Sequence, residues 1–222
     1  GTITHMRREI EEIPQAVARL LDRSGAALSE AGRGIRERDP HFIVTVARGS
    51  SDHAATFMKY AVELTAGLAV ASVGPSVASI YGTKLKLKGS ACLAISQSGK
   101  SPDIVALTEA ARAGGALTIA LTNTASSPLA RACDHAIDIL AGPERSVAAT
   151  KTFVNSAVAG LALMAHCTGD AALLAALARL PEAFERAIGC DWMPIAAAIP
   201  QGRSLFVLGR GPSLAMANEA AL

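Results

Sequence analysis

The stretch Leu93-Ala-Ile-Ser-Gln-Ser-Gly-Lys-Ser-Pro-Asp-Ile-Val105 decides the fold. The apolar run from Ala91 to Ile95 predicts a buried strand, which ends in a turn rich in serine and glycine. A helical pattern then opens at residues 101–103, where serine suits the N-cap and proline the first helical position. Gly99 lets the backbone of the turn approach a bound group closely. We therefore expect a strand, a tight turn and a helix in succession.

The same turn is a candidate anion site. The first N–H groups of the helix have no partner within the helix, and the positive end of the helix dipole lies behind them. The hydroxyls of Ser96, Ser98 and Ser101 would stand beside these donors. Such a group suits a phosphate dianion. The alternative is a well-capped connection without a ligand, and this stretch alone favours neither.

Outward from this stretch, the pattern of strand, Gly/Ser turn and helix recurs. Residues 42–47 predict a strand that is followed by Arg48-Gly49-Ser50-Ser51-Asp52 and a helix. Further strands are predicted at 68–73, 116–121 and 135–140, with helices between them. This alternation indicates an α/β fold, a doubly wound parallel five-stranded sheet with helices on both faces. Two donor-rich loops would then lie at one edge of the sheet, beyond the carboxyl ends of neighbouring strands.

Three further features leave alternatives open. Lys84, Lys86 and Lys88 alternate within 81–88, which favours a solvated edge strand over an anion-binding stripe. His53, in the first turn of a helix, is more readily an exposed polar residue than a catalytic one. Lys151 begins a long apolar helix after the loop 141–150, which is unfavourable for the helix dipole and points to pairing with Glu144 or a nearby anion.

Composition narrows the class of protein. Half of the 222 residues are apolar and 18% are charged, which is typical of a globular chain. The net charge of +2, without clustered arginine and interleaved aromatics, gives no reason to expect a nucleic-acid partner. The four cysteines lack metal-ligand or redox spacing, so we expect buried, reduced thiols in a cytoplasmic protein. No secretion signal opens the chain, and the run 153–167 is too short and polar for a membrane span.

Four segments are expected along the chain. Residues 1–38 predict an N-terminal helical arm, restarted or bent at Pro14 and loosened by Gly25 and 32–34, that packs against the main domain or a second subunit. The first α/β domain follows at 39–170, and a helical connector at 171–202. The segment 204–213 copies 42–51, so we expect a second copy of the domain to start near residue 203, in a natural protein longer by most of a domain.

Three loops together resemble the sugar isomerase (SIS) family. They are Arg48-Gly49-Ser50-Ser51, Ser96-Gln97-Ser98-Gly99-Lys100-Ser101 and Ser146-Val147-Ala148-Ala149-Thr150-Lys151. The chain is most similar to the isomerase portion of glucosamine-6-phosphate synthase and to stand-alone glucosamine-6-phosphate deaminases of that type. The resemblance implies a flavodoxin-like sheet and a homodimer. The sequence carries no metal cluster and no nucleotide fingerprint, so we expect no cofactor and no metal. The resemblance also implies a hexose phosphate ligand held by Gly49, Ser50, Ser51, Ser96, Gln97, Ser98, Ser101, Val147, Ala149 and Lys151.

The chain departs from that resemblance in three ways. Ala149 stands where the synthase loop usually has serine, and no cysteine precedes Cys92 to serve a glutaminase domain. The family's catalytic glutamate, histidine and lysine belong to the second copy, so the catalytic residues of this chain stay unassigned. Glu219 resembles a supporting acidic position, and a helix-surface glutamate is an equally good reading of it.

The expected function follows from the resemblance. It is a phosphosugar-binding isomerase/deaminase that converts glucosamine 6-phosphate to fructose 6-phosphate and ammonia. A related isomerase or deglycase that acts on a fructosamine or galactosamine phosphate is one alternative. A non-catalytic sugar-phosphate sensor is the other.

Overall fold

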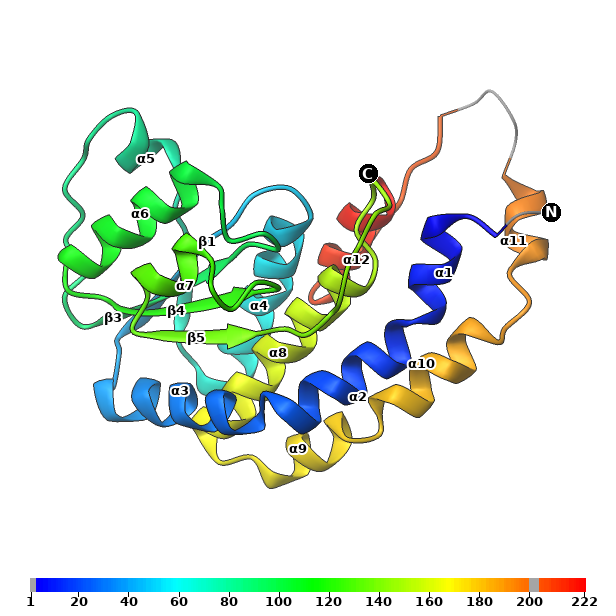
Figure 1. Cartoon of the computed structure of the whole chain (residues 1–222), viewed down its shortest axis with the longest axis horizontal. Helices are drawn as coiled ribbons and strands as arrows, with labels where there is room; N and C mark the ends of the chain where they lie inside the picture. The colour runs from blue at the N-terminus through cyan, green and yellow to red at the C-terminus, as the bar shows by residue number, and fades with distance from the viewer. Residues whose placement is uncertain (1–2, 200–203) are drawn as a thin grey trace.

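The computed structural model describes residues 3–199 and 204–222, and a parallel sheet of five strands lies at its centre (Figure 1). The strand order is β2-β1-β3-β4-β5. The strands are β1 (Phe42–Val46), β2 (Ala69–Ser72), β3 (Ser90–Ile95), β4 (Leu117–Thr122) and β5 (His135–Asp138). This confirms the predicted α/β class and the doubly wound sheet. The order reverses between β1 and β3, which makes that position the topological switch point of the sheet.

The helices connect and flank these strands. They are α1 (His5–Glu11), α2 (Ile13–Arg23), α3 (Gly25–Arg38), α4 (Ser50–Ala66), α5 (Ser76–Ser79), α6 (Pro102–Ala113), α7 (Pro128–Ala132), α8 (Lys151–Thr168), α9 (Ala171–Leu177), α10 (Leu180–Ile188), α11 (Met193–Ala198) and α12 (Ser213–Ala220). Residues 1–2 and 200–203, which fall in the predicted arm, in the connector and at the start of the predicted second copy, lie outside the described residues.

Successive strand residues point to opposite faces of the sheet, and each face packs against helices. Ile43, Leu93 and Ile119 belong to the core shared with α3, α4 and α8. Val44 and Cys92 belong to the core on the other face, under α6 and α7. This two-sided burial explains why the strands read as continuous apolar runs in the sequence.

The N-terminal arm packs against the α/β domain. Pro14 lies in the first turn of α2, so the chain restarts its helix there, as one of the two predicted outcomes. Helices α2 and α3 contact α8, and α2 also lies beside α10 (Figure 1). The arm was expected to pack against the main domain or against a second subunit, and the structure shows it packed against the main domain. The homodimer stays a prediction.

Gly32 and Gly34 of the arm serve close packing, which corrects the expectation that they loosen it. Helix α3 runs unbroken through Gly25, Gly32 and Gly34. A Cβ atom on Gly32 would lie 2.9 Å from the backbone nitrogen of Cys167 on α8. Glycine is thus required where α3 and α8 approach each other.

The expected lysine-bearing strand at 81–88 is wrong. This segment has no strand; it crosses the end of α6, and the N–H of Leu87 donates to the carbonyl of Gly114 at 3.0 Å. Leu87 is buried and Leu85 half-buried, whereas the three lysines are exposed. The alternation therefore reflects a surface segment with an apolar inner side, a pattern that a half-buried strand would also produce.

The predicted strand that opens the second copy is also absent. Residues 204–208 form no strand, and Phe206 and Leu208 are 84% and 91% exposed. A strand needs a neighbour to satisfy its backbone groups, and no strand in the described part of the chain lies beside this segment. The helix predicted after it is present as α12.

The cysteines follow the expectation in part. All four are free; Cys92 and Cys167 are buried and Cys133 is half-buried. Cys190 is exposed, which corrects its predicted burial. Burial raises the pKa of Cys92 and of Cys133 to about 12, so neither thiol ionises appreciably at neutral pH.

Asp134 fixes the approach to β5. Its Oδ2 accepts hydrogen bonds from the N–H and hydroxyl of Thr118, at 2.9 and 2.8 Å, and Arg112 lies 2.8 Å from Oδ1. Burial acts to raise the pKa of Asp134, but the bonds from Thr118 and the charge of Arg112 outweigh it and lower the pKa.

We predict that Gly32→Ala lowers the free energy of unfolding by about 1–3 kcal/mol, because the added methyl group forces α3 away from α8. Gly25→Ala is the matched control on the same helix, since nothing lies within 4 Å of its Cβ position. Urea denaturation of both variants is the measurement. Equal stability of the two variants would contradict the close approach.

A second prediction concerns pH. Because the folded-state pKa of Asp134 lies below the unfolded value of about 3.9, its ionisation stabilises the fold at every pH above that value. Asp134→Asn should therefore destabilise the protein most above about pH 5. The difference from wild type should shrink as the pH falls through the folded-state pKa. Urea titrations between pH 7 and pH 3 measure this difference, and a constant difference would refute the assignment.

Candidate functional site

The loop after β1 is built to present the start of a helix. Gly49 has φ +58, a left-handed conformation that glycine adopts without strain, and it is the N-cap of α4. Its carbonyl accepts from the N–H of Asp52 at 2.8 Å and from that of His53 at 3.3 Å. Ser50 and Ser51 thus form the first turn of a helix of 17 residues. Their N–H groups are among the first donors of that helix, which have no partner within it.

A cavity of about 190 Å³ opens at the switch point, where the ends of β1 and β3 lie side by side. Five of the ten predicted binding residues line it: Ser50, Ser51, Gln97, Val147 and Ala149. The three loops named in the sequence therefore meet at one place. The remaining lining residues are Arg48, Glu144, Ser146, Thr152, Phe153 and Ser156.

The serines of the turn after β3 are placed differently from the expectation. Ser96 is buried and its Oγ accepts from the N–H of Gly99 at 3.2 Å, while the Oγ of Ser98 accepts from the N–H of Lys100 at 3.2 Å. Ser101 occupies the N-cap of α6, but its side chain makes no capping hydrogen bond. These three serines shape or border the turn without lining the cavity, and Gln97 is the residue of this turn that lines it.

Gly99 is indispensable to this turn for two reasons. Its φ is +61, and a Cβ atom would lie 2.2 Å from the hydroxyl oxygen of Ser127 and 2.8 Å from that of Thr122. In addition, the Gly99 carbonyl accepts from the N–H of Leu129 at 3.0 Å. The turn is thus pressed against the β4–α7 connection.

Glu144 caps the start of α8 from inside the third loop. Its Oε1 accepts from the N–H of Thr150 at 3.1 Å, from the hydroxyl of Thr150 at 2.8 Å and from the N–H of Thr152 at 3.2 Å. The hydroxyl of Thr152 lies against Oε2. The positive end of α8 is therefore occupied by a carboxylate of the chain itself. At α4, by contrast, the N-cap Gly49 has no side chain to do the same.

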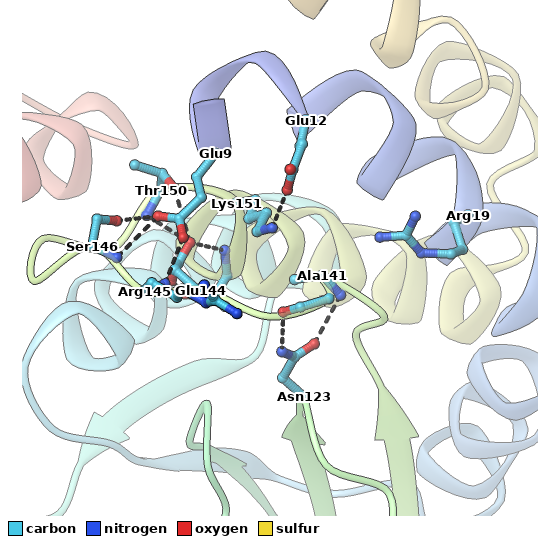
Figure 2. Close-up of polar contacts among 12 residues, drawn as sticks. Glu9, Glu12, Arg19, Asn123, Ala141, Glu144, Arg145, Ser146, Thr150 and Lys151 are labelled. Carbon is cyan, nitrogen blue, oxygen red and sulfur yellow. Dashed lines mark hydrogen bonds and ion pairs between the residues drawn. The ribbon is translucent and has the colours of Figure 1, made fainter. Parts of the chain in front are cut away.

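Lys151 does not reach the cavity. Its side chain is 2% exposed and its ammonium group pairs with Glu12 of the arm (Figure 2). Of the two alternatives from the sequence, pairing with Glu144 is wrong, because that carboxylate accepts from the threonines, whereas a nearby anion is found in the carboxylate of Glu12. Lys151 instead lines a second hollow, of about 250 Å³, between α1 and the loop after β5.

Two long-range contacts surround the site. The guanidinium group of Arg48 forms an ion pair with the carboxylate of Asp103 on α6, although Oδ2 of Asp103 accepts no hydrogen bond. This ion pair links the first loop to the second. The Nδ1 of His53 lies 2.6 Å from Glu219 of α12, and both side chains are at most 20% exposed. The expectation of an exposed His53 is therefore wrong, since α12 packs against α4 and covers it.

Most of the polar residues that line the cavity were not among the binding residues predicted from the sequence. Arg48 and Ser146 stand within the quoted motifs, so their position was available as a signal. Thr152, Phe153 and Ser156 lie on one face of α8 at spacings of one, three and four residues. That face was hidden because α8 is buried along nearly its whole length, so its few polar residues do not mark an exposed side in the sequence.

None of the helices in residues 3–199 and 204–222 is both long and apolar enough to traverse a bilayer. Among the same residues, no group of three or more His, Cys, Asp and Glu side chains could hold a metal ion.

We predict that Gly99→Ala destabilises the protein by about 2–4 kcal/mol, since a left-handed alanine costs about 1–2 kcal/mol and the collision with Ser127 adds to it. Gly67→Ala is the matched control, because Gly67 has a similar φ of +66 with nothing within 4 Å of its Cβ position. The difference between the two unfolding free energies, from urea melts, isolates the collision. Equal losses would show that the turn is not pressed against its neighbour.

Known protein structures superpose on this fold. A crystal structure of a candidate phosphosugar isomerase from Silicibacter pomeroyi DSS-3 superposes with a TM-score of 0.96 and 59% identity, over 99% of this chain and 67% of that chain. The C-terminal domain of glucosamine-fructose-6-phosphate aminotransferase from Francisella tularensis shares the fold, with a TM-score of 0.77 and 24% identity over 100% of this chain and 66% of that chain.

A curated relative is the glutamine–fructose-6-phosphate aminotransferase of Sulfurisphaera tokodaii, 31% identical over 221 residues. The match covers 98% of this chain but 36% of that protein, so this chain spans well under half the length of such relatives. The family model of the SIS domain matches residues 38–166, which is more than half of the chain. The chain therefore belongs to the SIS domain family.

Proposed function

We propose that this chain binds a hexose phosphate in the cavity at the switch point and forms part of an SIS-type isomerase/deaminase acting on an aminosugar phosphate. The observation that carries the proposal is the meeting of Ser50, Ser51 and Gln97 beyond the carboxyl ends of β1 and β3. Ligands of open α/β sheets bind in this crevice. The names of the relatives, an aminotransferase and a candidate phosphosugar isomerase, support the substrate class.

The start of α4 suits the phosphate. Two hydroxyls, on Ser50 and Ser51, stand beside the first N–H donors of a long helix, and the helix dipole adds a positive potential there. Arg48 brings the one cationic side chain among the lining residues. The opposite wall carries Glu144, Thr152 and Ser156, whose oxygens suit the hydroxyl groups of a sugar.

The proposed reaction needs this grip at a distance from the reacting carbons. In glucosamine 6-phosphate, an acid/base group moves a proton between C2 and C1 of the opened sugar. The imine at C2 is then hydrolysed, so that one water is consumed and fructose 6-phosphate and ammonia are formed. Binding energy from the phosphate positions C1 and C2 for that transfer. The resemblance to the family assigns the acid/base group to a second copy of the domain, and it stays unassigned in this chain.

Calorimetric titration with fructose 6-phosphate and glucosamine 6-phosphate tests the binding. Ser51→Ala should weaken both affinities about tenfold or more, because a hydrogen bond to a charged phosphate is worth about 1.5–3 kcal/mol. Ser126→Ala, at an exposed serine that does not line the cavity, is the matched control and should bind as wild type does. Failure of wild type to bind either sugar phosphate at millimolar concentration would reject the proposal.

Two further measurements separate the finer alternatives. Titration with fructose and with inorganic phosphate shows whether both halves of the ligand are recognised, and galactosamine 6-phosphate tests the choice of sugar. Release of ammonia from glucosamine 6-phosphate by the protein at its natural length distinguishes a deaminase from a sensor. We expect release; tight binding without turnover of any hexose phosphate would favour the sensor.

A further inference from the structure

The loop that follows β5 depends on side chains for its conformation. Residues 140–149, here named the site loop, make no backbone-to-backbone hydrogen bond within the described part of the chain. Yet four of its residues line the candidate cavity: Glu144, Ser146, Val147 and Ala149. Whatever fixes this loop therefore also shapes the cavity.

The arm fixes the beginning of the loop. The Nε of Arg19 on α2 donates to the carbonyl of Leu140 at 2.9 Å, and the hydroxyl of Ser24 donates to the carbonyl of Asp138 at 2.6 Å. Leu140 has φ +51, a left-handed conformation that is uncommon for a residue other than glycine. The carbonyl of Leu140 is thus held in an unusual orientation by a side chain more than 100 residues away in the sequence.

Glu9 of α1 fixes the middle of the loop. Its side chain points at the turn formed by residues 145 and 146 (Figure 2). Oε1 accepts from the N–H of Arg145 at 2.5 Å, and Oε2 accepts from the N–H of Ser146 at 3.1 Å. The hydroxyl of Ser146 lies against Oε2 as well. One carboxylate thus accepts from three donors of the loop.

This carboxylate is buried and charged. Glu9 is 5% exposed, and burial acts to raise its pKa. The hydrogen bonds from Ser146 and Arg145 and the positive charge of Lys151 outweigh burial and lower the pKa. A buried charge is kept only where donors compensate it, and here the donors come from the site loop.

Glu12 supports the same arrangement one turn along. Glu9 and Glu12 are three residues apart, so they share a face of the arm. Glu12 pairs with Lys151 at the start of α8, directly after the site loop. The arm therefore contacts the loop near its start, at its middle and just beyond its end.

From these contacts we infer that Glu9 is a positioning residue of the sugar-phosphate cavity: it fixes the backbone at Arg145 and Ser146, and so fixes the lining side chain of Ser146. Glu9 does not line the cavity and acts through the loop. The identity of the ligand rests on the function proposed above. A loop released from Glu9 must be ordered when the ligand binds, and that ordering lowers affinity.

The experiment compares Glu9→Gln with Glu11→Gln, an exposed glutamate of the same helix that pairs with Arg7. Glutamine has one acceptor oxygen, and its NH₂ group cannot accept a hydrogen bond from the second backbone N–H of the loop. Glu9→Gln should therefore release part of the loop. Hydrogen exchange by mass spectrometry over residues 141–149 should become about tenfold faster. The affinity for fructose 6-phosphate, by calorimetry, should fall about tenfold. Glu11→Gln should change neither.

Each outcome decides the inference. Faster exchange together with weaker binding supports it. Unchanged exchange overturns it, and faster exchange with unchanged affinity shows that the contact is structural only and also overturns it. If wild type does not bind the sugar phosphate, the proposed function fails, whereas the exchange data still decide whether Glu9 fixes the loop. Should Glu9→Gln fail to fold, Glu9→Asp, which keeps the charge but withdraws it by one methylene, is judged by the same two readouts.

Discussion

The parallel pairing of β1 with β3 is the constraint on which the rest of this structure depends. Residues 42–46 align with residues 90–94, so both strands end at the same level. The turns that follow, at 48–51 and 96–101, are thereby brought side by side although about fifty residues separate them. Since the strand order reverses here, no connection crosses the gap between the turns, and a cavity is left open.

The sequence predicted the sheet well because the relevant forces are local. Phe42–Val46 and Ser90–Ile95 are largely β-branched or apolar runs, and both faces of the sheet require such runs. The segments 81–88 and 204–208 carry a similar pattern, yet neither forms a strand. Strand formation needs a partner at hydrogen-bonding distance, and the pattern of one segment holds no information about its neighbour.

The binding roles of the predicted site residues stay predictions, and the structure shows how their side chains are placed. The three loops were identified, and half of the predicted binding residues line the cavity. The hydroxyls of Ser96 and Ser98 point into their own turn because short polar side chains satisfy nearby backbone donors first. Lys151 turned to Glu12 because a buried ammonium group requires a carboxylate, and the arm supplies one. Such a contact joins residues 139 apart in the sequence, where periodicity and spacing give no signal.

The side-chain anchoring of residues 140–149 also bears on how such a protein can diverge. A strand cannot change its main-chain pairing without disturbing its neighbours, whereas a segment held by a few carboxylate and guanidinium groups can exchange most of its own side chains and leave the sheet intact. In this architecture the side chains of a cavity-lining loop can therefore vary without changing the folding of the scaffold. Substitutions in this loop put the fold at little risk, as long as the carboxylate of Glu9 and the N–H groups of residues 145 and 146 that it accepts from are retained.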